Sequence, residues 1–286
     1  MKIASIDIGT NAVKSKIFKT TPTSIEFIEG IRSPIRLGTD VFTNGLLTKD
    51  KLDLLIRTLR KYQKNFIKNK ISMYEIVATS AFRDTQNSEE ARRYVENKIE
   101  HPIRIISGLE EAKLIRFHPK AQSRSSKVYV DVGGGSTEIY IYQNNKHIIQ
   151  SFQLGAVRGM LSKDVPEEWL RLKKWLKKQP KTTTLVGLGG NIRSFLNLNN
   201  TKKMKSENFI KEITNLNSLD VGTKISAYKL QKDRADVIDF ALQIYIEIIK
   251  ILKVQEIKST KWGVSDSIAV KTFHELYSKK ISISRS

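Results

Sequence analysis

The chain has 286 residues and a formal net charge of +21, from 50 Lys and Arg against 29 Asp and Glu. Its hydrophobic fraction of 40% is typical of a globular protein, and its length suits two domains of ordinary size. The absence of cysteine excludes disulfides, thiolate metal sites and cysteine nucleophiles, and the four scattered histidines show no zinc-type spacing. Because the first residues contain neither a signal peptide nor a membrane span, we expect a cytoplasmic protein that does not contact the membrane.

The positive charge favours an anionic partner, although a lysine-rich surface without functional meaning would explain it equally well. Part of the charge is nevertheless patterned. Residues 49–69 have the apolar spacing of an amphipathic helix, and five basic side chains share its other face: Arg57, Arg60, Lys61, Lys64 and Lys68. A second basic helix is predicted over residues 167–178, and residues 112–130 contain no acid.

The first part of the chain predicts a strand meander followed by alternating helices and strands. Residues 3–18 form two apolar, β-rich runs around a turn, and we expect a third strand over residues 24–31. Residues 34–45 are expected to be a loop. After the helix 49–69 come a strand over 73–79, a helix that starts at Asn87 or at Ser88 with Ser88 as its N-cap, a short strand over 103–106 and a helix that opens at Leu109. This order predicts a mixed α/β domain.

Residues 127–142, KVYVDVGGGSTEIYIY, form a second hairpin around three glycines. We expect Gly133, Gly134 and Gly135 to take φ values that only glycine adopts freely, and to present amide N–H groups to an oxyanion. The Ser136 and Thr137 hydroxyls would add donors. The sequence therefore predicts a phosphate-binding turn.

Asp131 precedes this turn and Glu138 follows it. Two carboxylates beside phosphate would repel it unless a divalent cation lay between them, so the pattern implies Mg²⁺ or Mn²⁺. A bare glycine run is more often a tight hairpin with a solvated acid at each end. The first hairpin weakens that alternative, because its Asp7 aligns with Asp131 and its Gly9 with Gly133, which suggests a duplicated fold.

The remaining elements follow the same plan. We expect a third strand over residues 147–153, the basic helix, a buried strand over 184–188 that enters Gly189 and Gly190, a helix from Asn191, a short helix over 208–216, a long helix over 234–254, a strand over 256–259 and a closing helix over 265–277.

Seven blocks, in this order, resemble signatures of the exopolyphosphatase and guanosine pentaphosphate phosphatase (Ppx/GppA) family, within the acetate kinase, sugar kinase, Hsp70 and actin superfamily. They are DIGTNAVK from Asp7, ATSAFRD from Ala78, ISGLEEAKLI from Ile106, VDVGGGSTEI from Val130, LGAVR from Leu154, GLGGNIRS from Gly187 and RADVI from Arg234. The resemblance covers essentially the whole chain, and the ordered set is far more specific than any single block. The chain resembles the short type of the family, without a helical C-terminal extension.

The resemblance implies an α/β fold of two ribonuclease H-like domains with a cleft between them. Residues 1–120 would form the first domain, with the first phosphate loop and the catalytic glutamate. Residues 121–286 would form the second, with the last helix, from about residue 265 to 286, packing back on the first. A homodimer is left open.

The resemblance also implies roles for individual residues. Glu111 matches the catalytic glutamate that activates the attacking water, Arg83 matches a phosphate-contacting arginine, and Asp131 and Glu138 match acids that hold the metal or position the water. The residues expected to bind phosphate are Asp7, Gly9, Thr10, Asn11, Lys14, Gly133, Gly134, Gly135, Ser136, Thr137, Gly189 and Gly190. Without the resemblance, Glu111 would read as a solvated acid in the first turn of a helix.

The sequence departs from the family pattern at three places. Asn191 stands where the family usually has threonine, Asp239 and Phe240 stand near an expected proline and glycine, and residues 265–267 replace an Arg-Glu pair. The expected function is hydrolysis of the terminal phosphate of inorganic polyphosphate by an activated water. Alternatives are a guanosine pentaphosphate 5′-phosphatase, an ATP-dependent kinase of a small molecule, and a polyanion-binding protein without activity. Nucleic acid is not the expected partner.

Overall fold

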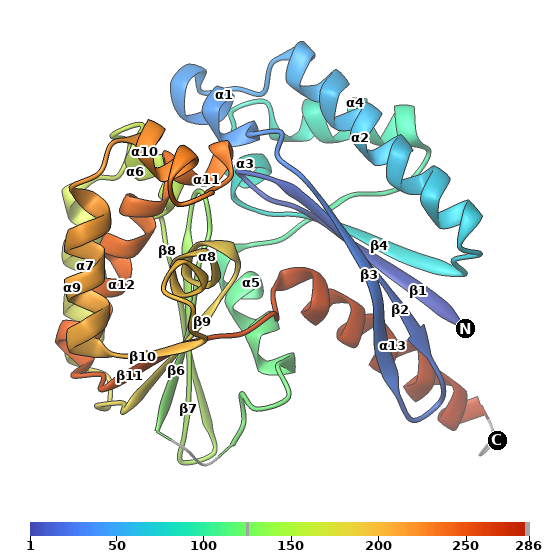
Figure 1. The fold of residues 1–286 in the computed structure, drawn as a ribbon. Helices are drawn as coiled ribbons and strands as arrows, with labels where there is room; N and C mark the ends of the chain where they lie inside the picture. Colours follow the sequence, from blue (N-terminus) through green and yellow to red (C-terminus); the bar gives the residue numbers. More distant parts are fainter. Residues whose placement is uncertain (124–125, 284–286) are drawn as a thin grey trace. The chain divides into compact units, whose positions relative to one another are not determined.

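The computed structural model describes residues 1–123 and 126–283, and the chain forms two compact units. The first unit consists of Met1–Ser107 and the chain from Val264 onward, and the second is Gly108–Gly263 (Figure 1). No helix of the described residues is both long and apolar enough to span a bilayer.

The first unit is built on a five-stranded sheet in the order β3-β2-β1-β4-β5. The strands are β1 (Lys2–Ile8), β2 (Val13–Thr20), β3 (Ile25–Ser33), β4 (Met73–Ala78) and β5 (Arg104–Ile105). β1, β2 and β3 are antiparallel neighbours, whereas β4 runs parallel to β1 and β5 parallel to β4. The helices are α1 (Leu37–Asn44), α2 (Lys49–Lys68), α3 (Ser80–Arg83), α4 (Ser88–Ile99) and α13 (Val264–Ile283). α13 packs against β1, β2 and β4, and α2 packs against α4.

The second unit is built on a six-stranded sheet in the order β10-β11-β9-β6-β7-β8. Its strands are β6 (Lys127–Val132), β7 (Thr137–Gln143), β8 (Lys146–Phe152), β9 (Thr184–Leu188), β10 (Lys203–Lys205) and β11 (Glu256–Ser259). Its helices are α5 (Gly108–Leu114) with the 3-10 turn η1 (Ile115–Phe117), α6 (Ala156–Met160), α7 (Pro166–Lys177), α8 (Gly190–Leu198), α9 (Ser206–Asn217), α10 (Val221–Ser226), α11 (Lys232–Ala235) and α12 (Ile238–Leu252). α5 packs against β7 and β8, whereas α12 contacts β6 and the helices α6 to α9.

Both sheets share one plan, in which three antiparallel strands are followed by two strands parallel to the first. β8-β7-β6-β9-β11 repeats the order β3-β2-β1-β4-β5. Asp7 near the end of β1 and Asp131 near the end of β6 therefore occupy equivalent positions. The predicted fold class, α/β with two related domains, is confirmed.

Some predicted elements differ from the structure. Residues 34–45 contain the helix α1 rather than only a loop. Glycine is needed at position 38 of this helix, because a Cβ there would lie only 2.1 Å from Cγ2 of Thr10. Asn87, not Ser88, is the N-cap residue of α4, since the Ser88 hydroxyl donates to the carbonyl of Phe82. The expected long helix over 234–254 is interrupted between α11 and α12.

The expected domain boundary at residue 120 also differs from the division of the structure. The first compact unit ends at Ser107, so α5 with Glu111 belongs to the second unit, because this helix packs on β7 and β8. α13 belongs to the first unit.

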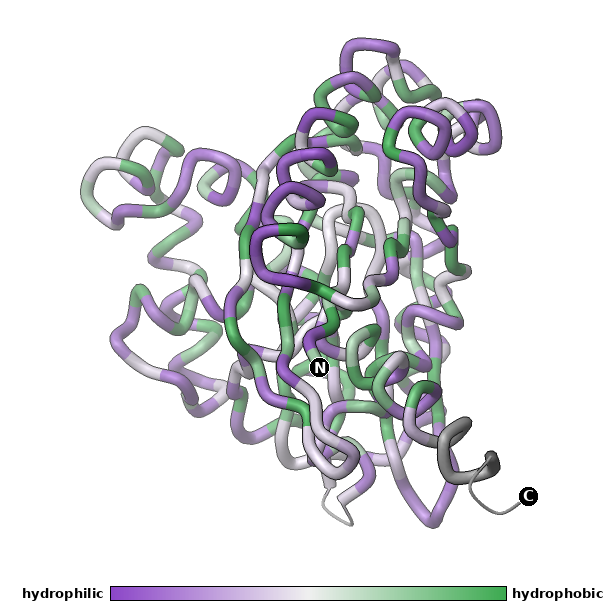
Figure 2. Tube along the Cα trace, turned by 90° about the vertical axis from the view of Figure 1, so that its right-hand side faces the viewer, coloured by the Kyte–Doolittle hydropathy of each residue, from purple (hydrophilic) through white to green (hydrophobic). Residues whose placement is uncertain are grey.

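The basic helix α2 is amphipathic, as expected. Leu55, Leu59 and Tyr62 are fully buried, and the Tyr62 hydroxyl donates to the carbonyl of Val13. Arg57, Lys61, Lys64 and Lys68 are exposed. In Figure 2 the helical turns of the tube carry hydrophilic and hydrophobic residues together, as amphipathic helices do.

Candidate active site

Two carboxylates lie side by side where β6 and β7 meet the glycine turn. Asp131 and Glu138 are direct partners in the antiparallel register, so their side chains share one face of the sheet. Such partners have Cβ atoms about 5 Å apart. Glu138 is only 2% exposed, and its Oε1 accepts a hydrogen bond of 2.9 Å from the Ser151 hydroxyl on β8. The strand register therefore holds both acids close together.

The glycine turn between them is shaped by close packing rather than by unusual φ values. None of Gly133, Gly134 and Gly135 has a positive φ, contrary to the expectation from the sequence. Their carbonyls instead accept hydrogen bonds from the start of α6: the amides of Ala156 and Val157 donate at 2.9 and 2.8 Å to Gly133 and Gly134, and Nε of Arg158 donates at 2.9 Å to Gly135. Since the carbonyls are held from this side, the turn is rigidly placed.

The amides of the turn are used unequally. The N–H of Gly133 donates to the carbonyl of Ser136 at 2.9 Å, whereas the N–H groups of Gly134 and Gly135 donate to no backbone acceptor in the described part of the chain. Ser136 is buried. Thr137 does not serve as the predicted phosphate donor, because its fully buried hydroxyl donates to the carbonyl of Leu154 at 2.6 Å.

A second glycine turn lies directly beside Asp131. Gly189 has φ 79°, and a Cβ at this position would lie 2.6 Å from Oδ1 of Asp131. A Cβ at Gly190 would lie 2.5 Å from a guanidinium nitrogen of Arg234. The positive φ of Gly189 favours glycine, and its contact with Asp131 shows that the glycine pair belongs to the same site as Asp131.

Asn191 joins these parts. Its buried side chain donates to the carbonyl of Val132 at 2.9 Å and accepts a hydrogen bond from Arg234. The departure from the family pattern at this position therefore has a structural role. Burial, and after it the nearby charge of Asp131, raise the pKa of the fully buried Tyr245.

Glu111 lies on α5, the helix that packs against β7 and β8. Its side chain is only 8% exposed. This burial differs from the solvated first-turn acid that the sequence alone suggested for Glu111. The structure thus brings a third carboxylate-bearing element onto the strands that carry Glu138 and Ser151.

In the first unit the equivalent turn is flanked by one acidic and one basic side chain instead of two acidic ones. Asp7 and Lys14 are register partners, and Nζ of Lys14 lies 3.2 Å from Oδ2 of the buried Asp7. Gly9 donates its amide to the carbonyl of Ala12 at 3.2 Å, which closes the turn. Thr10 and Asn11 accept through their carbonyls from the amides of Gly38 and Arg36, so both tie the turn to the start of α1.

Arg83 lies at the end of α3, which follows β4. Its Nη1 donates to the carbonyl of Ile106 at 2.8 Å, and its Nε lies 3.9 Å from the carboxylate of Asp84. The structure therefore fixes the guanidinium against Ile106, a residue close in sequence to Gly108, where α5 begins.

The acids of the second unit fit a hard divalent cation only in part. The described residues contain no cluster of three or more Asp, Glu or His side chains that could enclose a metal. Mg²⁺ is commonly held by one or two carboxylates together with substrate phosphates, and the adjacent Asp131 and Glu138 match that arrangement. The pair Asp7 and Lys14 does not.

The profile of the Ppx/GppA phosphatase family matches residues 16–276. The chain belongs to the Ppx/GppA phosphatase family. The fold is similar to that of an exopolyphosphatase from Cytophaga hutchinsonii, with a TM-score of 0.86 at 19% identity over 96% of this chain and 98% of that one. A Ppx/GppA family member from Aquifex aeolicus gives a TM-score of 0.77 at 24% identity, over 96% of this chain and 98% of that one. An exopolyphosphatase-like protein gives 0.81 at 20% identity, over the same shares. Membership in the family supports phosphatase activity on phosphoanhydrides.

Two arginines of this Ppx/GppA protein reach the site although the sequence analysis assigned them no role. Arg158 donates to the carbonyl of Gly135, and Arg234 lies against Gly190 and Asn191. Both belong to blocks that carried the resemblance, LGAVR and RADVI. Their presence in those blocks was the available signal.

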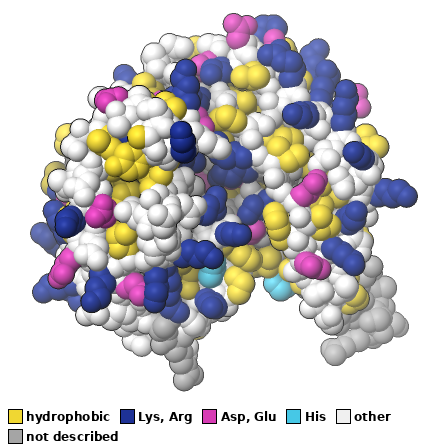
Figure 3. Space-filling view, in the orientation of Figure 1, with side chains coloured by type: hydrophobic (Ala, Val, Ile, Leu, Met, Phe, Trp, Pro, Cys, Tyr) yellow, Lys and Arg dark blue, Asp and Glu magenta, His cyan; other side chains and the backbone are white. Residues whose placement is uncertain are grey.

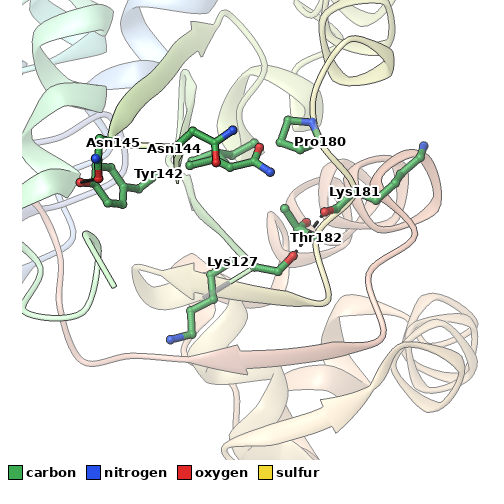
Figure 4. Close-up of a pocket in the computed structure, with 10 residues that line it drawn as sticks. Lys127, Tyr142, Asn144, Asn145, Pro180, Lys181 and Thr182 are labelled. Atoms are coloured by element: carbon green, nitrogen blue, oxygen red, sulfur yellow. Dashed lines mark hydrogen bonds between the residues drawn. The ribbon is translucent and has the colours of Figure 1, made fainter. Parts of the chain in front are cut away.

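A cavity of about 450 Å³ lies at the other end of the same sheet, away from Asp131. It is lined by Ser126, Lys127, Ile141, Tyr142, Gln143, Asn144, Asn145, Pro180, Lys181 and Thr182. In Figure 4 the ammonium groups of Lys127 and Lys181 point away from its centre. This cavity shares no residue with the paired acids.

Proposed function

We propose that this protein is an exopolyphosphatase that hydrolyses the terminal phosphate of inorganic polyphosphate. The observation that carries the proposal is the buried Glu111 on a helix that packs on the strand bearing Glu138, whose register partner is Asp131. These are the acids that hydrolysis of a phosphoanhydride requires: a base for water, and oxygen ligands for a cation beside the phosphates.

In this proposal Glu111 accepts a proton from the attacking water. The water oxygen forms a bond to the terminal phosphorus while the bond to the bridging oxygen breaks, and the shortened chain departs with that electron pair. Asp131 and Glu138 would hold Mg²⁺ or Mn²⁺, which would supply positive charge to the phosphoryl oxygens. The Ser151 hydroxyl, which donates to Glu138, would keep that carboxylate in place.

Phosphate would be held in the second unit by the amides of Gly134 and Gly135, next to Ser136. Two guanidinium groups support this turn and the glycine pair, those of Arg158 and Arg234. Such preformed donors stabilise charge without reorganising during the reaction. In the first unit, Lys14, Thr10 and Asn11 of the Gly9 turn, together with Arg83, are proposed phosphate contacts.

A guanosine pentaphosphate 5′-phosphatase is the alternative with the most similar chemistry, because its substrate also ends in a hydrolysable phosphoanhydride. An ATP-dependent kinase would require a second substrate as phosphate acceptor. Release of phosphate from polyphosphate with Mg²⁺ and no acceptor supports the proposal over a kinase or an inactive binder. A much higher kcat/KM for guanosine pentaphosphate than for polyphosphate would contradict it.

The test of the mechanism is Glu111→Gln, with Glu110→Gln as its control on the same helix. The amide keeps the shape of the acid but cannot accept a proton, so turnover should fall by about 10²- to 10⁴-fold. Polyphosphate binding should be retained, because one negative charge is removed beside a polyanion. The exposed Glu110 should tolerate the change. If Glu111→Gln turned over within about threefold of the wild type, Glu111 would not be the base.

A further inference from the structure

A cluster of basic side chains lies on the second unit, at the end of β6 that is farthest from Asp131. Lys127 opens β6 and Lys258 lies on β11, with β9 between the two strands. Lys127 and Asp131 share a face of β6 and lie four residues apart, which is about 13 Å along a strand. This cluster is therefore separate from the paired acids.

The strand register shows which side chains share this face. Tyr129, Val186 and Lys258 form one row across β6, β9 and β11, and Lys127 belongs to the next row with Thr184 and Glu256. Figure 4 shows the Lys127 side chain leaving the cavity that its backbone helps to line. Its Nζ donates at 3.3 Å to the Ser123 hydroxyl. Lys127 thus turns toward the segment that precedes β6.

That segment contributes His118 and Lys120. The His118 ring packs against Tyr129 and Trp262, with ring centroids 5.1 and 5.4 Å apart. The hydroxyl of Tyr129 donates at 2.6 Å to the carbonyl of Lys120, which fixes the turn over the sheet. The amide of Lys120 lies 3.1 Å from Nδ1 of His118. Because Nδ1 accepts this bond, the ring is neutral and its hydrogen sits on Nε2, which is a donor.

The charges of the cluster are not balanced. Burial, and after it the charges of Lys120 and Lys127, lower the pKa of the half-buried His118 to about 4. Burial, and after it the charges of Lys258 and Lys120, also lower the pKa of Lys127. In the described part of the chain, no carboxylate lies within ion-pair distance of Lys120, Lys127 or Lys258. The acid in the same row as Lys127, Glu256, lies with its carboxylate 3.7 Å from Nζ of Lys203 on β10 instead.

We propose that Lys120, Lys127, Lys258 and His118 form a second anion-binding site, which takes a compact anion of several linked phosphates. The strand register places Lys127 and Lys258 on the same face of the sheet as Tyr129, and the turn that carries His118 and Lys120 is tied to this face by the Tyr129 hydroxyl. The aromatic rings of Tyr129 and Trp262 hold the imidazole. An anion with several charges relieves the repulsion among the lysines, which a single monovalent ion does less well. The site does not rest on the proposed function, because binding here requires no hydrolysis.

The probe is inorganic tripolyphosphate, added with excess chelator so that metal-dependent turnover does not consume it. The His118 ring is followed by NMR through a pH titration, with His118→Gln used to assign its signal. Bound tripolyphosphate offsets the lysine charges, so the pKa of His118 should rise from about 4 toward its ordinary 6.5. An unchanged His118 titration at saturating tripolyphosphate would overturn the proposal.

The matched variants separate this site from the paired acids. The double variant Lys120→Ala and Lys258→Ala should weaken the binding reported by His118 by about tenfold or more, whereas Lys211→Ala with Lys229→Ala removes the same charge elsewhere on the unit and should leave it unchanged. Equal loss in both pairs would reduce the effect to net charge and refute the site. An equal His118 response to inorganic phosphate would refute the preference for linked phosphates. A stronger response to ADP than to tripolyphosphate would identify a nucleoside diphosphate as the ligand and overturn the choice of an inorganic chain. Glu111→Gln should leave the His118 response intact even if it abolishes turnover.

Discussion

Gly155→Ala tests whether the position of the glycine turn limits catalysis. Gly155 has φ −159° and ψ 160°, an extended conformation that alanine adopts without strain. A Cβ at Gly155, however, would lie 2.6 Å from backbone atoms of Gly134 and Gly135. To reach the 3.4 Å of ordinary van der Waals contact, the turn and the start of α6 must separate by about 0.8 Å.

A shift of this size displaces the proposed phosphate donors relative to Asp131 and Glu138. Misplacement of reacting groups by about 1 Å can cost on the order of 10²-fold in rate, so kcat/KM on polyphosphate should fall by about 10- to 100-fold. The loss of packing should also lower Tm by several degrees, as overpacking typically costs about 1–3 kcal/mol.

The assay is phosphate release beside a thermal melt of the same preparation. Gly30→Ala is the control, because its new Cβ would lie no closer than 3.4 Å to any neighbouring atom, at an exposed position of β3. Activity of Gly155→Ala within about threefold of the wild type, together with a lowered Tm, would show that the turn moves without consequence, and would refute the reasoning.

Three further outcomes are expected. Asp131→Asn and Glu138→Gln should each raise the Mg²⁺ concentration needed for half-maximal rate as well as lower the rate, and an unchanged metal requirement would remove both from the metal site. The pKa of His118 in the folded protein is about 4, below its ordinary 6.5. His118 should therefore not affect the free energy of unfolding above pH 6.5, and should lower it as the pH falls from 6.5 toward 4, because the unfolded chain then binds the proton more readily. His118→Gln should flatten this part of the pH profile in chemical denaturation. At physiological ionic strength, salt screens charges beyond about 8 Å, so α2 should affect only a chain long enough to reach it. The double variant Lys61→Glu and Lys64→Glu should therefore weaken the binding of long polyphosphate more than that of tripolyphosphate, and equal effects would exclude α2 as a binding face.

The fold could be predicted where local pattern and tertiary structure agree. The strands β9 and β11 occupy the predicted residues 184–188 and 256–259. The two predicted hairpins, β1 with β2 and β6 with β7, occupy equivalent places in two sheets that share one strand order. The helix α1 could not be predicted, because it contains Gly38, which the packing of Thr10 demands and which local propensity disfavours in a helix.

The site shows the same limit. The pairing of Asp131 with Glu138 follows from a hairpin whose turn length fixes the register, which the sequence already indicates. The attachment of Glu111 to the second unit depends on the packing of α5 against β7 and β8, and no local pattern encodes it. Thr137 likewise looked like a ligand donor, but a hydroxyl in a turn can also donate to a nearby carbonyl, as it does to Leu154.

Basic side chains are spread widely over the visible face of the molecule and outnumber the acidic ones (Figure 3). Net charge therefore does not locate a ligand on this protein. The clusters around Lys127 and along α2 are distinguished from the rest by their arrangement. The former has a half-buried imidazole and three lysines that form no ion pair with a carboxylate among the described residues, and the latter forms a single helix face.

The first unit is assembled from both ends of the chain, which matters for its synthesis. Ile3 and Phe18 on the sheet form one buried cluster with Ala269 and Phe273 of α13, and Lys16 forms an ion pair of 2.6 Å with Asp266. A ribosome that adds about 5–20 residues per second needs roughly 10–30 s to travel from the end of the N-terminal segment to this helix. Until α13 is made, the apolar surface of β1 and β2 lacks this cover, whereas every residue of the second unit precedes α13 in the chain. The N-terminal segment of the first unit, Met1–Ser107, is thus translated first and completed last, and a premature stop near residue 264 would damage the sheet that begins at residue 2.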